Sequence, residues 1–293
     1  MRIERAYQTL VNRRDERSME YFWHGYNSKD PAVVNLCAVL LAHIDPEGLS
    51  ASIVRDLDTY RASAWSLLNS EIKIPSNTWD AHWYQGWAIS SGLIALADLP
   101  VFNPDNVIPH IMALSCPDRE FSQYAAKTLR KKLNGDQFVD ALFLFLARRD
   151  SFLSAEVEIY INAITGYKEV APAVARNLKI LLDQADSVPD GVFWIYKVIA
   201  LKTLEQTGAP EQIPLLEVFV RDKSSYLQTY RQEAGSASGT SDATPETVYF
   251  ADVAEKAVQA IRTRSNRGVE TAQDRGGQDR SCCIRKPFQL CSS

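Results

Sequence analysis

Residues 104–133, PDNVIPHIMALSCPDREFSQYAAKTLRKKL, decide the fold of this chain. The stretch predicts two short amphipathic helices joined at Cys116-Pro117-Asp118. We expect Asp105 to cap the first helix and Asp118 to cap the second, because a carboxylate can accept the backbone N–H groups left free at a helix start. Pro109 is tolerated because it falls close to that start.

Each predicted helix carries one apolar stripe at spacings of three and four residues. The stripe of the first helix consists of Val107, Ile108, Ile111, Met112 and Leu114, and that of the second of Phe121, Tyr124, Ala125, Thr128, Leu129 and Leu133. A hairpin this small cannot bury both stripes alone. We therefore expect it to be one unit in a stack of helical hairpins, in which neighbouring units supply the missing core.

The order of features resembles a HEAT repeat. The resemblance rests on Ile108-Pro109, the turn at Pro117-Asp118, and Ala125-Ala126 followed by Leu129. Similar features recur near the end of the chain, in Ile213-Pro214-Leu215-Leu216 followed by Ala254, Ala257, Val258 and Ile261. The resemblance implies an all-α, right-handed solenoid and by itself says little about function.

The rest of the chain divides into helical segments that pair in the same way. The predicted pairs are 16–27 with 31–44, 48–70 with 79–99, the two helices of 104–133, 137–147 with 152–165, 169–184 with 190–207, and 211–220 with 246–263. Residues 137–147 are almost all apolar, which predicts a helix packed on several sides. Gly86 and Gly92 lie inside a predicted helix, where glycine is unfavourable, so we expect a neighbour to pack closely against them.

The predicted organisation is one solenoid of about six hairpins over residues 1–265 and a flexible tail over 266–293. A lead-in helix is expected at 2–13, and residues 233–245 predict a flexible loop inside the last hairpin because they contain little apolar surface. From Ser265 onward we see no helical period. The tail is expected to be disordered, or ordered only by a partner.

The charge of the chain disfavours a nucleic-acid partner. The formal net charge is −4, and residues 1–265 hold 27 basic and 33 acidic side chains. A body this acidic is poorly suited to neutralising phosphates.

Cysteine use and hydropathy point to a reduced, cytoplasmic compartment. The five cysteines are scattered, with Cys282, Cys283 and Cys291 confined to the tail, and predict no disulfide framework. No stretch approaches the roughly 20 apolar residues of a membrane helix, so we expect no membrane association.

Sequence patterns for catalysis and metal binding are missing. The chain has no Gly-rich phosphate loop with a lysine, no Gly-x-Ser-x-Gly and no His-Glu-x-x-His. The four histidines never occur at i and i+4. We therefore predict no catalytic residue, no metal site and no cofactor.

The one concentration of unusual residues is aromatic. Trp79, Trp83 and Trp87 follow one another at intervals of four, with His82 and Tyr84 between them. This spacing aligns the three indoles along one side of a helix. Two interpretations remain open: packing between repeats, or exposed anchors for a partner, which requires Trp83 with Tyr84 or Trp87 to be accessible to solvent.

Basic residues gather near predicted helix ends, among them Arg130, Lys131 and Arg148. Positive charge at a helix C-terminus is favoured by the helix dipole in any protein. If the ends of successive hairpins align, these residues could instead form a basic ridge for an acidic partner. The HEAT-like alkylpurine DNA glycosylases combine such residues to hold DNA, but their overall positive character is not matched here.

The function that we predict is a non-enzymatic scaffold or adaptor. The second helices of the hairpins would form a concave surface that binds a protein or peptide segment, with Trp79, His82, Trp83, Tyr84, Trp87, Arg130, Lys131 and Arg148 as candidate contacts. An alternative is an enzyme resembling the HEAT-like bilin lyases, in which a solenoid cradles an acidic tetrapyrrole. The sequence leaves the oligomeric state open.

Overall fold

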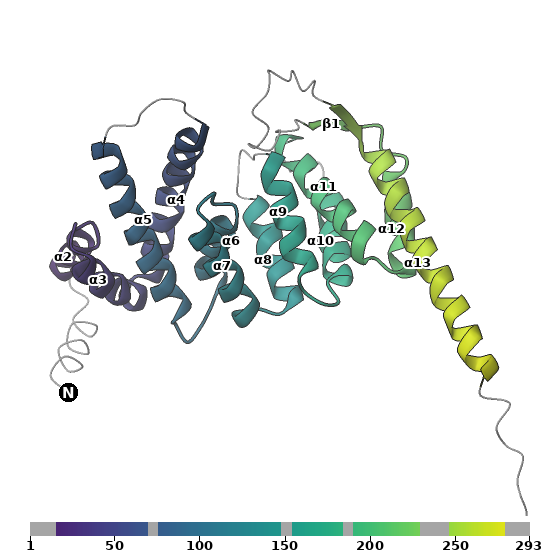
Figure 1. Ribbon diagram of the computed structural model, residues 1–293, viewed down its shortest axis with the longest axis horizontal. Coiled ribbons are helices and arrows are strands. Elements are labelled where there is room, and N and C mark those ends of the chain that lie inside the picture. The colour runs from purple at the N-terminus through teal and green to yellow at the C-terminus, as the bar shows by residue number, and fades with distance from the viewer. Residues whose placement is uncertain (1–15, 70–75, 148–153, 184–189, 229–245, 279–293) are drawn as a thin grey trace, which may run out of the picture.

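A computed structural model describes residues 16–69, 76–147, 154–183, 190–228 and 246–278. Within these ranges the chain is mostly helical, as Figure 1 shows, which confirms the predicted all-α class. The helices are α2 (Glu16–Tyr26), α3 (Pro31–Ile44), α4 (Pro46–Asn69), α5 (Ser76–Ala97), α6 (Pro104–Leu114), α7 (Arg119–Lys132), α8 (Gly135–Ala147), α9 (Ser154–Thr165), α10 (Ala171–Asp183), α11 (Asp190–Thr207), the 3-10 turn η2 (Pro210–Gln212), α12 (Ile213–Phe219) and α13 (Phe250–Gln278).

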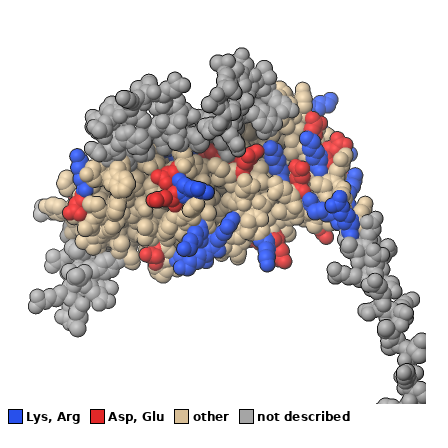
Figure 2. Space-filling model, in the orientation of Figure 1, with Lys and Arg blue, Asp and Glu red and all other residues tan. Residues whose placement is uncertain are grey.

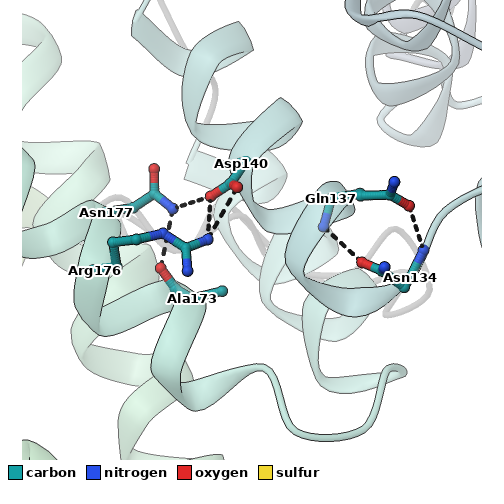
Figure 3. A network of polar contacts seen from close by, with 6 residues as sticks. All are labelled: Asn134, Gln137, Asp140, Ala173, Arg176 and Asn177. Carbon is teal, nitrogen blue, oxygen red and sulfur yellow. Dashed lines mark hydrogen bonds and ion pairs between the residues drawn. The ribbon is translucent and has the colours of Figure 1, made fainter.

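Side chains that accept backbone N–H groups start several of these helices. Asp30 accepts from the Ala32 N–H at the start of α3, and Asp118 accepts from the Glu120 N–H at the start of α7, both at 2.9 Å. At α8, the Asn134 side chain accepts from the Gln137 N–H at 2.9 Å, and the Gln137 side chain accepts from the Asn134 N–H at 3.1 Å (Figure 3). This reciprocal pair is a capping box.

The cap of α6 differs from the expectation. Asn103, rather than Asp105, is the capping residue, and its side chain accepts from the Asn106 N–H at 3.0 Å. The physical reason is Pro104, which occupies the first helical position, where its missing N–H costs nothing. Asp105 therefore lies inside the first turn.

The helices pack on partners that are close in sequence. In one row, α4 packs on α6, α6 on α8 and α8 on α10. Beside it, α3 packs on α5 and α5 on α7, and farther along α9 packs on α11 and α11 on α13. Figure 1 shows the consequence, a helical array that runs from α2 and α3 at one end to α12 and α13 at the other.

The core is continuous through the middle of this array. Nearly every described side chain of α6 is buried, and α8 packs on α6, α9, α10 and α11, as its apolar sequence predicts. Close packing at the α5 glycines is also confirmed. A Cβ at Gly92 would lie 2.6 Å from Ile53 Cδ1, and one at Gly86 would lie 3.3 Å from Tyr60 Cε2.

The last unit departs from the prediction in two ways. Residues 246–249 are not the start of a helix but strand β2 (Glu246–Tyr249), which pairs antiparallel with β1 (Ser225–Gln228), Tyr226 opposite Val248. Strand structure is favoured by the side chains of Thr247, Val248 and Tyr249. Their pairing with β1 outweighed the helical pattern of the residues that follow. In addition, α13 continues to Gln278, so the expectation that helical structure ends near Ser265 is wrong.

Several expectations fall on residues outside the described ranges. These are the lead-in helix at 2–13, the loop at 233–245, the cysteines of the tail and residues 279–293. Within the described ranges, none of the helices is both long and apolar enough to cross a membrane.

Candidate functional site

The five aromatic and histidine candidates all lie on α5, between Trp79 and Trp87. Trp83 is 64% exposed and Tyr84 is 36% exposed, so the accessibility required of an anchor is met. The backbone of Trp79 and His82 is part of the same helix, but their side chains lie outside the described part of the chain. Trp83 is therefore the most exposed of the candidates whose side chains are described.

Trp87, one turn after Trp83, has a different environment. It is half-buried and packs against the hydrophobic core, and its ring lies 6.1 Å from that of Trp83 at an angle of 49°. Its indole N–H is buried and has no hydrogen-bond acceptor. The indoles thus divide between the two interpretations: Trp87 packs partly against the core, while Trp83 lies beside it on the solvent side.

The structure adds a second apolar face that the sequence did not single out, on α3. Leu36 is 55% exposed and Val39 is 39% exposed, while Val34, Ala38 and Leu41 on the other side of the helix are buried. The sequence of α3 is apolar all round, which is typical of a helix covered on every side. Because its residues are apolar on all sides, α3 must either be covered on every side or expose an apolar face. This feature of the sequence is the signal from which the face could have been found.

The exposed faces of α3 and α5 are adjacent. The Ser91 hydroxyl of α5 contacts the Asn35 side chain of α3 and also donates to the Trp87 carbonyl at 2.9 Å. Residues three or four positions apart share a helix face, so Val39 lies beside Asn35, and Trp87 and Ile94 lie beside Ser91. We call the resulting area the α3–α5 surface, which consists of Leu36, Val39, Trp83, Tyr84, Trp87 and Ile94.

The edge of the α3–α5 surface carries a positive charge. Lys29, in the turn before α3, places its Nζ 5.8 Å from the centre of the Tyr84 ring, within the range of a cation–π interaction. This contact holds the Tyr84 ring near the start of α3. An exposed apolar area with a charged rim is typical of an interaction surface.

The three basic candidates do not come together as one site. Arg130 and Lys131 are exposed in the last turn of α7, whereas Arg148 lies outside the described ranges. The Arg130 guanidinium reaches the end of α9, where its Nη2 lies 2.5 Å from the point that a Cβ on Gly166 would occupy. The Arg130 guanidinium therefore lies near the C-terminus of α9, while its backbone is in the last turn of α7.

A cluster of polar side chains surrounds the Cys116-Pro117-Asp118 turn, but it is buried. Arg61 of α4 and Glu156 of α9 form an ion pair at 2.6 Å, with side-chain exposures of 6% and 2%. Tyr60 donates to Asp118 at 3.1 Å and Tyr160 contacts Ser115 at 3.4 Å. Sequence spacing does not predict the pairing of Arg61 with Glu156, because the two residues come from distant helices.

The protonation states in this region do not suit a nucleophile or a base. Burial raises the pKa of the Cys116 thiol to about 11, so the reactive thiolate is scarce near neutral pH. Burial lowers the pKa of His110 to about 4, and both ring nitrogens lie within 3.1 Å of backbone carbonyl oxygens. These groups are positioned for packing within the core.

Among the described residues, no three His, Cys, Asp or Glu side chains gather in a way that could hold a metal ion. A search of protein-family models, curated proteins and solved structures finds no match to this chain.

Proposed function

We propose that the chain is a HEAT-like solenoid built of six hairpins: α2/α3, α4/α5, α6/α7, α8/α9, α10/α11 and α12/α13. The support is the packing order: the first helices α4, α6, α8 and α10 pack in succession, and the second helices pack from α3 to α5 to α7 and from α9 to α11 to α13. Local contacts repeated in this way are typical of a repeat protein. Under this proposal, α3 and α5 are second helices, the ones expected to line the concave surface.

We infer that the protein binds a protein or peptide segment on the α3–α5 surface and catalyses no reaction there. The observation that carries this proposal is the exposure of Trp83 on α5 and of Leu36 and Val39 on the adjacent helix α3. Burying apolar surface gains about 25 cal/mol per Å², and tryptophan is among the residues that most often dominate binding energy. The buried, unreactive state of Cys116 and His110 also favours binding over chemistry.

The test compares the proteins captured from native-cell lysate by the wild type and by the double variant Trp83→Ser, Leu36→Ser. Both side chains are exposed, so we expect each change to alter the free energy of unfolding by less than about 0.5 kcal/mol. The amount of partner captured by the double variant should fall by at least roughly 10-fold, because a hot-spot tryptophan contributes about 2 kcal/mol or more to binding. Quantitative mass spectrometry measures the loss.

The matched control is Ile180→Ser on α10, an exposed apolar residue on a first helix, 47% exposed. The control should capture the same proteins as the wild type. Identical capture by all three proteins would contradict the proposal. Trp87 is unsuited to this test, because truncating a tryptophan packed on the core costs about 3 kcal/mol or more of stability.

A further inference from the structure

On the side of α5 that faces away from α3, the neighbouring surface is basic. Helix α7 packs on α5, and its buried face consists of Phe121, Ala125, Thr128 and Leu129. On the opposite face Lys127, Arg130 and Lys131 are exposed within five residues. Figure 2 shows Lys and Arg side chains gathered at the lower edge of the molecule near its middle, where α7 ends in Figure 1.

Two of these three cations form no ion pair with another residue that the structure describes. Exposed arginines elsewhere pair with acids, Arg176 with Asp140 at 2.8 Å (Figure 3) and Arg262 with Glu217 at 3.1 Å. No ion pair between described residues includes Lys127 or Lys131, whereas Arg130 reaches the end of α9 and Lys132 donates to the Leu99 carbonyl at 3.4 Å. Lys127 and Lys131, one turn apart, share a face.

These two lysines continue the α3–α5 surface. A Cβ on Gly86 of α5 would lie 3.5 Å from Phe121 Cζ, and Lys132 donates to the Leu99 carbonyl just after α5, so α7 runs alongside α5 from its start to its end. The acidic side chains nearby are Glu120, two turns before Lys127, and Asp98 at the end of α5, which acts on Tyr124. From α3 and α5 to α7, the exposed side chains thus change from mainly apolar ones to charged ones, with Lys127 and Lys131 beside Glu120 and Asp98.

We propose that the partner of this surface is an acidic amphipathic protein segment. Its apolar side chains lie on the α3–α5 surface, and its Asp or Glu side chains contact Lys127 and Lys131. The inference rests on the proposed binding function and adds the charge of the partner to it. Charge complementarity of this kind selects partners and speeds their association. It acts only at short range, because charges are screened over about 8 Å at physiological salt.

The experiment pans a phage-displayed library of random peptides against the full chain. Peptides enriched on the wild type should combine apolar or aromatic residues with an excess of Asp and Glu. Panning on Lys127→Glu, Lys131→Glu should remove that acidic excess and keep the apolar one. For a peptide selected on the wild type, the double lysine variant should bind roughly 10-fold more weakly at low salt.

The matched control is Lys168→Glu, Lys179→Glu, which changes the net charge equally through two exposed lysines elsewhere. It should select the same acidic peptides as the wild type. Apolar peptides without an acidic excess would overturn this inference and leave the proposed function standing. If the Trp83→Ser, Leu36→Ser variant enriches the same peptides as the wild type, or if no peptide is enriched on the wild type, both the proposed function and this inference are contradicted. Binding of single-stranded DNA that depends on Lys127 and Lys131 would also overturn the inference.

Discussion

At the scale of single residues, burial decides what a side chain can do. His110 shows this most clearly, since it lies at a conspicuous place in the stretch that decides the fold but is completely buried. Its Nδ1 lies 2.9 Å from the Asn106 carbonyl oxygen and its Nε2 3.1 Å from that of Leu93. Desolvation disfavours the imidazolium, although both carbonyls would accept a hydrogen bond from it, and the pKa falls to about 4.

His110 predicts a loss of stability in acid. The unfolded chain binds a proton near the ordinary histidine pKa of about 6.5, and the folded chain binds it only near pH 4. Stability is therefore fully present above about pH 6.5 and falls as pH drops to about 4, by an amount on the order of 3 kcal/mol. Urea unfolding at several pH values measures this slope.

The matched variant for this measurement is His110→Gln, which can still donate to one of the two carbonyls and does not titrate. Its free energy of unfolding should change less than that of the wild type between pH 6.5 and 4. Equal slopes for the two proteins would show that other groups cause the acid sensitivity.

At the scale of elements, α5 has one side that packs closely on other helices and one side that is exposed. Its inner side must approach α4 and α2 closely, and its outer side leaves Trp83 in solvent. Gly92 allows this close approach, because Ile53 Cδ1 and the Tyr26 hydroxyl would lie 2.6 and 2.7 Å from a Cβ at that position. Gly86 has more room, with the nearest atom at 3.3 Å.

The two glycines should therefore respond differently to alanine. In Gly92→Ala the added methyl overlaps Ile53 and Tyr26, and we expect a loss of about 1–3 kcal/mol in the free energy of unfolding. In Gly86→Ala the tight contact at 3.3 Å requires only a small shift of the Tyr60 ring, and the higher helix propensity of alanine, worth roughly 1 kcal/mol, offsets the cost of that shift. Thermal or urea unfolding of both variants checks this. A Gly92→Ala protein as stable as Gly86→Ala would contradict the close approach.

At the scale of the molecule, most helix contacts are local, and the Arg61–Glu156 pair is an exception. It connects α4 to α9, which are separated in the sequence by the helices α5 to α8. Asp58 lies 3.9 Å from Arg61 Nη1, while Arg61 Nε and Nη1 have no hydrogen-bond partner. A buried pair that is incompletely satisfied contributes little net stability but is costly to break on one side.

Removing one partner of this pair should lower the free energy of unfolding much more than replacing both partners. Glu156→Ala leaves the Arg61 charge buried, so we expect a loss of about 3–5 kcal/mol. The double variant Arg61→Met, Glu156→Leu should unfold within about 1–2 kcal/mol of the wild type. Arg176→Ala, at the exposed pair with Asp140, is the control and should cost less than about 1 kcal/mol. A loss as small as the control's in Glu156→Ala would contradict the buried pairing.

Much of the helical framework could be predicted from the sequence. Asp30-Pro31 and Asp118 start α3 and α7 as expected, and the apolar residues of α8 indicate its central position. These features depend on residues within one or two turns of each other. The prediction failed where distant residues compete with the local pattern, as in β2, whose pairing with β1 depends on residues far upstream.

Only the α5 part of the candidate site could be predicted from the sequence. The spacing of Trp79, Trp83 and Trp87 identifies α5, but it assigns the three rings to one side and cannot say which of them a neighbour covers. The structure shows that Trp87 is partly buried against the core while Trp83 is exposed, and that Leu36 is exposed on the adjacent helix α3.

The sequence by itself determined the all-α class and the positions of most of the helices, because capping and apolar periodicity act over a few residues. Only the tertiary structure decided which apolar faces remain in solvent and how Arg61 meets Glu156. Exposure and buried pairing are properties of two or more helices together, so they depend on how separate parts of the chain pack.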